Sequence, residues 1–154
     1  MISDADALTR LINEAFLAER PFVEGDRVDH AGVLKYLATG KFLLLERNQS
    51  LIGCVYLERR GDHMYLGLLS VASSEQGKGW GRKLMDAAER YAAKEGCVAI
   101  DLRVISERAD IRPFYERLGY AAVAVEAVAT AIPVKVPFHF VVMSKPIGRA
   151  QGAQ

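Results

Sequence analysis

Residues 75–85, EQGKGWGRKLM, decide the fold because they place glycine at positions 77, 79 and 81 and follow it with Arg82 and Lys83. The preceding run LGLLSV is typical of a strand, and we expect an amphipathic helix to begin near Lys78. The first amides of a helix have no partner within it and lie at the positive end of its dipole, so they bind phosphate readily. Glycine also lacks the Cβ atom that would hold a bulky anion away from the backbone. The stretch therefore predicts a phosphate-binding loop, and the alternative is a flexible basic turn.

Two nucleotide-binding motifs fit this loop poorly. The loop of nucleotide triphosphatases needs Ser or Thr after Gly-Lys, whereas Gly79 follows Lys78 here. The dinucleotide fingerprint needs a third glycine where Arg82 stands and an acid at the end of the next strand, whereas Asp101 lies in the middle of VAIDLRV. An NAD(P)-dependent oxidoreductase is therefore kept only as a lesser alternative.

The segments on either side of the loop predict the fold class. Two helices are expected before residue 40, the second capped by Asp29 and ended by Gly40. A helix opened by the glycine loop and another that starts near Asp110 are expected later in the chain. The order predicts an α/β fold (α+β, mixed) with a single central mixed β-sheet and helices on both faces. The first three strands should pair antiparallel, and the fourth should be buried on both faces. The predicted strands lie within residues 41–47, 51–60, 63–71, 97–104, 120–128 and 138–145.

Length and composition limit the classes of protein. The 154 residues predict a single domain over residues 1–154. The net charge of +1 gives no bulk attraction to nucleic acid or membrane. No apolar run has membrane-spanning length and the N-terminus does not resemble a signal peptide, so a cytoplasmic location is expected. Cys54 and Cys97 stand alone in apolar contexts and the three histidines lack metal-ligand spacing, so we expect reduced core cysteines and no metal.

Two segments of the chain resemble one known family. Residues 76–81, QGKGWG, fit a signature of Gln or Arg, two residues, Gly, one residue, and Gly or Ala. A second segment, FYERLGY at residues 114–120, lies on the helix after the next strand. In this order and at this separation, they resemble the GNAT superfamily of acetyl-coenzyme A (acetyl-CoA)-dependent N-acetyltransferases. The resemblance covers about residues 41–145 and, more loosely, the two N-terminal helices.

The resemblance implies an enzyme in which a primary amine attacks the thioester of acetyl-CoA directly. It implies that the strand carrying Leu69 and Val71 bulges and splays from the next strand, so that its backbone pairs with the pantetheine arm. The amides of residues 77–82 would cradle the pyrophosphate, and Tyr115 would be the general acid that protonates the leaving thiolate. The alternative for Tyr115 is a core aromatic residue whose hydroxyl bonds a backbone carbonyl. The coenzyme-binding residues predicted in this way are Leu69, Val71, Gln76, Gly77, Lys78, Gly79, Trp80, Gly81, Arg82, Lys83, Ser106 and Arg108.

The sequence leaves alternatives for two of the roles in the site. Many family members carry Asn seven residues before that tyrosine, where Arg108 stands here. Either Arg108 reaches the phosphates of the coenzyme or Ser106 takes the polar contact. The candidate general bases are Glu24, Asp26 and Glu58, and a chain of water molecules is the alternative.

The acceptor is expected in a cleft between residues 20–27 and the last two strands. It is a small amine, an amino acid, an antibiotic or a protein N-terminus. The apolar stretch 127–140 fits a modest pocket or a homodimer contact. The rival to an enzyme is a non-catalytic acyl-CoA-binding or sensor module, which would bind the coenzyme without releasing free thiol.

Overall fold

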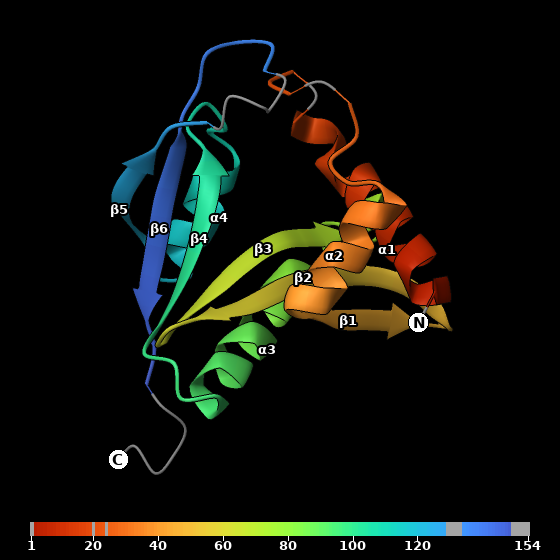
Figure 1. The fold of residues 1–154 in the computed structure, drawn as a ribbon, viewed down its shortest axis with the longest axis horizontal. Helices are drawn as coiled ribbons and strands as arrows, with labels where there is room; N and C mark the ends of the chain where they lie inside the picture. Colours follow the sequence, from red (N-terminus) through yellow and green to blue (C-terminus); the bar gives the residue numbers. More distant parts are fainter. Residues whose placement is uncertain (1, 20, 24, 129–133, 149–154) are drawn as a thin grey trace.

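The protein consists of a six-stranded mixed sheet with helices on both faces, in a computed structural model that describes residues 2–19, 21–23, 25–128 and 134–148 (Figure 1). The mixed α/β prediction is confirmed. No helix in the described part of the chain is long and apolar enough to cross a membrane. The elements are α1 (Ile2–Ala15), η1 (Phe16–Glu19), α2 (His30–Thr39), β1 (Lys41–Arg47), β2 (Ser50–Arg60), β3 (His63–Val71), η2 (Ser73–Glu75), α3 (Trp80–Lys94), β4 (Ala99–Ile105), α4 (Ile111–Arg117), β5 (Ala121–Glu126) and β6 (Phe140–Pro146).

The strand order is β1-β2-β3-β4-β6-β5. The first three strands pair antiparallel, as predicted from their tight turns. β3 and β4 run parallel, and β6 pairs antiparallel with both β4 and β5. The last strand of the chain therefore lies between two earlier ones, and the sequence did not predict this order.

β3 and β4 pair over a short distance and then diverge. Their pairing ends at Tyr65 and Asp101, although β3 continues for six more residues to Val71. The Asp101 carboxylate ties the junction, because one oxygen lies 2.7 Å from His63 Nδ1 and the other accepts a 2.6 Å hydrogen bond from Ser144 Oγ. The two halves of the sheet separate beyond this point and leave an opening between them (Figure 1).

A β-bulge marks β3 where it leaves β4. Tyr56 of β2 lies opposite Gly67, but Cys54 lies opposite Ser70, so β3 holds one extra residue here. Leu68 in the bulge has φ +55°, in the left-handed region that leucine rarely adopts. The splayed and bulged strand implied by the family resemblance is present.

The bulge changes which β3 side chains face each layer of helices. Met64 and Leu66 before it, and Leu69 and Val71 after it, all pack in the core cluster formed with α3 and α4. Leu68 instead packs with α1 and α2 in a second cluster on the opposite face. Strict alternation would have put residues 66 and 68 on one face. The extra residue therefore presents Leu69 and Val71 at the opening.

The prediction that the fourth strand is buried on both faces fails only in the middle of one face, whose end residues Ala99 and Ile105 are buried. Ile100, Leu102 and Val104 of β4 are buried against α3 and α4, but Arg103 is exposed and Asp101 is half-buried. These two side chains lie on the other face of the strand, and Arg103 lines the opening left by β3.

We predict that Asp29→Ala lowers the free energy of unfolding by about 1 kcal/mol, because a helix cap is lost. The Asp29 side chain accepts a 2.7 Å hydrogen bond from the Gly32 amide at the start of α2, as the sequence predicted. Urea denaturation measures the change. Asp29→Asn keeps an acceptor at the cap and is the control, since asparagine caps about as well as aspartate. Equal losses in both variants would contradict the capping role.

Candidate functional site

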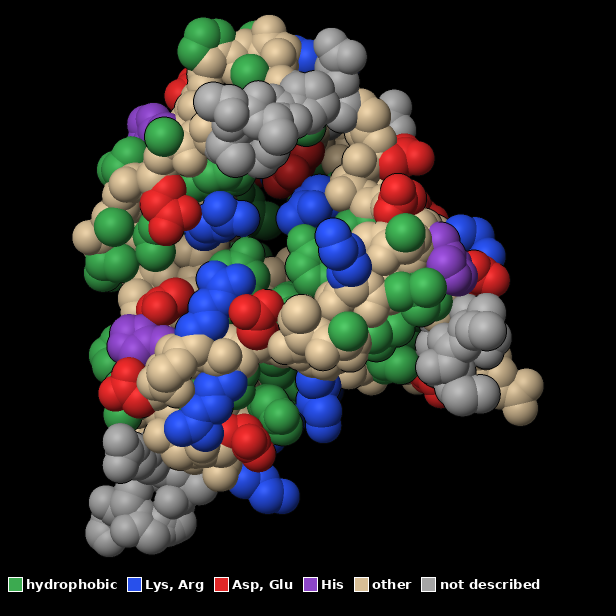
Figure 2. Space-filling model, in the orientation of Figure 1, with side chains coloured by type: hydrophobic (Ala, Val, Ile, Leu, Met, Phe, Trp, Pro, Cys, Tyr) green, Lys and Arg blue, Asp and Glu red, His purple; other side chains and the backbone are tan. Residues whose placement is uncertain are grey.

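A cavity of about 940 Å³ fills the opening between β3 and β4. Its walls come from the end of α1, η1, Val23, residues 25–27, β3, the glycine loop, β4, α4 and Phe140 of β6. Figure 2 shows the hollow on the face that carries α1 and α2, with Lys and Arg side chains along its rim. The divergence of the sheet thus produces a site that elements from the whole chain surround.

The glycine loop presents open backbone amides to this cavity. Gly77 and Gly79 have φ +80° and +84°, and a Cβ atom on either would meet no atom within 4 Å. The first amide bonded into α3 is that of Lys83, which donates to the Gly79 carbonyl at 3.1 Å. Within the described ranges, the amides of residues 77–82 donate no hydrogen bond. Open amides at the start of a 15-residue helix have the chemistry that suits an anion.

Several side chains of the loop are held by the Glu75 carboxylate, and only some of them line the cavity. The Glu75 carboxylate accepts hydrogen bonds from Trp80 Nε1 (3.1 Å), Lys78 Nζ (3.3 Å) and Arg47 Nη1 (3.0 Å). The bond from the indole, helped by Lys78, lowers the pKa of Glu75. Trp80 lines the cavity, whereas Lys78 does not. Lys83 also lies outside the lining, with its ammonium 5.9 Å from the Trp80 ring centre.

The end of β3 forms a second open edge beside the loop. Leu69 and Val71 line the cavity, in the part of β3 that has no β4 partner. The Gln76 side-chain amide donates to the Val71 carbonyl at 3.1 Å and holds the loop against the strand end. Gly81 and Arg82 continue the lining onto α3. A strand edge and an anion site therefore lie next to each other.

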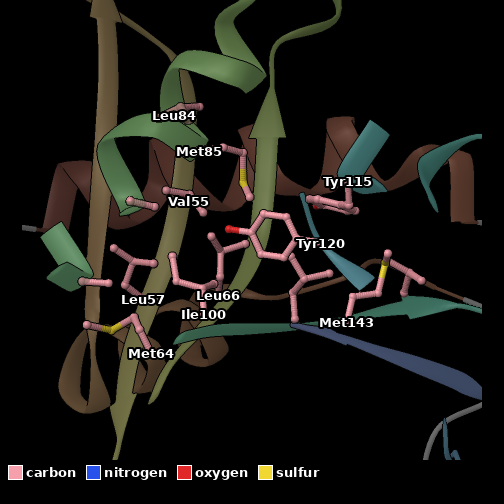
Figure 3. Packing of buried hydrophobic residues seen from close by; sticks show 14 of the residues in the cluster. Val55, Leu57, Met64, Leu66, Leu84, Met85, Ile100, Tyr115, Tyr120 and Met143 are labelled. Atoms are coloured by element: carbon pink, nitrogen blue, oxygen red, sulfur yellow. The ribbon is translucent and has the colours of Figure 1, made fainter. Parts of the chain in front are cut away.

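Tyr115 of α4 lies at the boundary between the core and the cavity. It is 6% exposed, and its ring packs edge-on against Phe114 and Tyr120, at centroid distances of 5.1 and 6.0 Å. Figure 3 shows Tyr115 beside Tyr120 in the core cluster. Its hydroxyl makes no hydrogen bond to any residue that the structure describes, backbone carbonyls included. Burial raises the pKa of Tyr115, so the phenol keeps its proton well above neutral pH.

Arg108 and Ser106 lie in different places. Arg108 lines the cavity with its side chain 11% exposed, and its guanidinium bonds Asp110 (2.7 Å) and Glu19 (3.4 Å). Ser106 does not line the cavity, and its Oγ accepts a 3.1 Å hydrogen bond from the His139 amide. Arg108 is thus the residue of the pair that faces the site, although its charge is already matched by carboxylates.

Glu19 is a half-buried acid in the cavity wall that was not among the predicted site residues. Of the three predicted candidate bases, Glu24 lies outside the described residues and Asp26 lines the exposed rim. Glu58 does not line the cavity, and its carboxylate accepts hydrogen bonds from Tyr56 and Arg60. Helical spacing could have indicated Glu19, because position 19 continues the face of the first helix that carries the buried Leu8 and Ile12. An acid there was a reason to expect a buried carboxylate.

Two segments distant in sequence meet at one side of the cavity. Val23 forms an antiparallel bridge with Val134, and the Lys135 amide donates to the Phe22 carbonyl at 2.7 Å. The Phe22 and Phe138 rings pack edge-on at 6.5 Å. The acceptor cleft was predicted between residues 20–27 and the last two strands, and residues 134–138 lie just before the second of these strands. The two segments touch each other, so this side of the cavity is bridged rather than open along its length.

Known proteins share both the sequence pattern and the fold. The model of the acetyltransferase (GNAT) family matches residues 5–120. Ard1 from Thermoplasma volcanium is 14% identical with a TM-score of 0.79, covering 96% of this chain and 93% of that one. The ribosomal-protein-S18-alanine N-acetyltransferase from Escherichia coli is 17% identical with a TM-score of 0.74, covering 99% and 93%. The PaiA N-acetyltransferase from Thermoplasma acidophilum, in complex with coenzyme A, is 18% identical with a TM-score of 0.74, covering 94% of each chain.

Proposed function

Because the chain belongs to the acetyltransferase (GNAT) family, we propose that its cavity binds acetyl-CoA and catalyses transfer of the acetyl group to a primary amine. The observation that carries the proposal is the row of open amides at residues 77–82, next to the unpaired edge of β3. The first feature suits a pyrophosphate and the second suits the amide-containing pantetheine arm. A dinucleotide would leave the strand edge without a partner.

Each wall of the cavity has a role in this proposal. The amides of residues 77–82 hold the pyrophosphate, and Arg82 adds a positive charge. The edge of β3 near Leu69 and Val71 pairs with the pantetheine arm, which brings the thioester toward Tyr115. We assign the side chains of Lys78 and Lys83 no direct contact, since they lie against Glu75 and Trp80 and outside the cavity lining. Arg108 is assigned to the carboxylates that it already bonds rather than to coenzyme phosphates.

The reaction is a direct displacement at the acetyl carbonyl. The amine nitrogen attacks the carbonyl carbon, a C–N bond forms and the C–S bond breaks. The sulfur leaves as a thiolate, and the Tyr115 hydroxyl protonates it to give free coenzyme A. Tyr115 holds the proton that this step needs, because burial raises its pKa and keeps the phenol protonated at neutral pH.

The proposed acceptor is the α-amino group of a polypeptide N-terminus. The name of the Escherichia coli relative specifies an alanine of a ribosomal protein. The contact of residues 21–23 with residues 134–138 also favours an acceptor that enters end-first, with its amine at the tip. A small amine meets the same geometric requirement and is the second candidate.

A pair of measurements tests the proposed function. Coenzyme A at about 100 times its dissociation constant should stabilise the fold by about 2.7 kcal/mol in thermal unfolding, whereas NAD should not. Thiol release from acetyl-CoA is then followed with short peptides that have a free α-amino group, with the same peptides N-acetylated, and with small amines. Turnover only with the peptides that have a free α-amino group supports the polypeptide acceptor. Turnover only with small amines would show that a small amine is the acceptor instead. Binding without thiol release would instead support the non-catalytic acyl-CoA module.

A further inference from the structure

We propose that Glu19 is the general base that takes the proton from the attacking amine. This inference rests on the proposed function and adds to it the second proton-transfer group. Few acids can take this role, because the described cavity lining contains only Glu19, Asp26, Glu75 and Asp110 as acids. Glu75 belongs to the coenzyme side, where its carboxylate bonds the glycine loop.

The backbone fixes Glu19 at the end of η1. Its carbonyl accepts hydrogen bonds from the amides of Phe22 and Val23, both at 2.9 Å, which turn the chain sharply after the helix. The side chain lines the cavity and is 20% exposed, so a substrate can reach it. Its Oε2 atom accepts from Arg108 Nη1 at 3.4 Å, and Oε1 has no hydrogen-bond partner within the described chain. One oxygen is therefore held in place while the other is open to an amine.

Glu19 and Tyr115 approach the cavity from different elements. Glu19 comes from η1 beside α1, and Tyr115 comes from α4 on the other side of the divergent sheet. Both line the cavity, and the charge of Glu19 is close enough to influence the phenol of Tyr115. An acceptor that attacks the thioester between them has a base on one side and an acid on the other.

The proton balance closes with these two groups. As the C–N bond forms, one N–H proton of the amine moves to the Glu19 carboxylate. As the C–S bond breaks, the Tyr115 proton moves to the thiolate. Glu19 then returns its proton to water at its exposed oxygen, and the tyrosinate takes one back from water. The products are the acetylated amine and the free thiol of coenzyme A, with no net change in the enzyme.

The charged surroundings suit a base that works near neutral pH. Burial raises the pKa of Glu19, and the charges of Arg108 and Arg27 oppose that rise in part. Asp110 adds to the rise as a like charge. A raised pKa makes the carboxylate more basic, while the two arginines keep it ionised. The acidic limb of the rate profile should therefore lie above the ordinary pKa of a glutamate, with the rate falling as pH falls through it.

A structural role is the competing explanation, because the Glu19–Arg108 pair also fastens the segment after α1 to the start of α4. Asp110 provides the matched control. It bonds the same guanidinium at 2.7 Å, closer than Glu19 does, but it is 67% exposed. If holding Arg108 is what matters, Glu19→Gln and Asp110→Asn should have similar effects.

The experiment compares Glu19→Gln, Glu19→Asp and Asp110→Asn in the full chain, using the acceptor that gives thiol release with the unmodified enzyme. We expect Glu19→Gln to lower kcat about a hundredfold and to remove the acidic limb of the pH profile. In Glu19→Gln the affinity for coenzyme A, measured by calorimetry, should change less than about threefold. Asp110→Asn should lower kcat far less than Glu19→Gln does, and it should keep an acidic limb that moves to lower pH, because a like charge near Glu19 is removed. Glu19→Asp keeps the carboxylate, so its acidic limb should remain while kcat falls by less.

The outcomes separate this inference from the proposed function. Equal losses of kcat in Glu19→Gln and Asp110→Asn would overturn the assignment of Glu19 as the general base. An acidic limb that persists in Glu19→Gln would do the same. Neither result would contradict the proposed acetyl transfer. If Glu19→Gln does not fold, a kcat in Glu19→Asp equal to that of the unmodified enzyme would overturn the assignment as well, because the shorter side chain should place the carboxylate farther from the amine. The absence of thiol release from the unmodified enzyme with every acceptor would overturn the proposed function and this inference together.

Discussion

Gly79→Glu should lower the affinity for coenzyme A by about a hundredfold or more while the protein remains folded. The new side chain would project into open space, since a Cβ atom at position 79 meets no atom within 4 Å, and its carboxylate would lie beside the open amides. Placing like charges together costs several kcal/mol, and each 1.4 kcal/mol is a factor of about ten in affinity. Calorimetric titration with coenzyme A measures the change.

Gly96→Glu is a closely matched control for this variant. Gly96 has the same φ of +84° as Gly79, and a Cβ atom there also meets nothing within 4 Å. It lies beyond the other end of α3, outside the cavity lining. Both substitutions place a side chain and a charge at a left-handed position, so both should lose similar stability. Unchanged affinity in a folded Gly79→Glu protein, or an equal loss in Gly96→Glu, would identify the loop as an ordinary turn.

Local signals in the sequence predicted most of the elements. The Asp29 cap, the three strands joined by tight turns and the helix after the glycine loop each depend on residues close together in the chain. Such signals depend on residues within one or two turns of a helix or within one hairpin. The structure confirms the elements that they predicted. The glycines also indicated a loop with an open backbone, because their left-handed conformation is a property of the residue itself, and the structure has this loop at Gly77 and Gly79.

Long-range packing decided the features that sequence reasoning did not provide. Nothing in a leucine predicts φ +55°, so the bulge at Leu68 was implied only through the family resemblance. The insertion of β6 between β4 and β5 depends on pairing across many residues. The contact of Glu19 with Arg108 joins two positions 89 residues apart. The expectation of a doubly buried β4 failed for the same reason, since local apolar content cannot show that its neighbour diverges.

Tyr115→Phe should lower kcat by a factor between about a hundred and ten thousand, the range expected when a general acid is lost. The phenylalanine ring keeps the contacts with Phe114 and Tyr120, so packing and coenzyme affinity should change little. No hydrogen bond of the hydroxyl to a described residue is lost, so the melting temperature should stay close to that of the unmodified protein. Steady-state rates and melting curves from the same preparation test both expectations.

Tyr120→Phe provides the matched comparison in the same core cluster. Tyr120 is 2% exposed and lies outside the cavity lining, and its hydroxyl donates to Glu89 at 3.1 Å. Removing that hydroxyl should cost about 1 kcal/mol of stability, because a buried hydrogen bond is lost, and should leave kcat almost unchanged. The two variants are therefore expected to show opposite patterns, one in rate and the other in stability. If turnover of Tyr115→Phe stays within about threefold of the unmodified enzyme, below any useful acid contribution, Tyr115 is a core residue and the thiolate takes its proton from elsewhere.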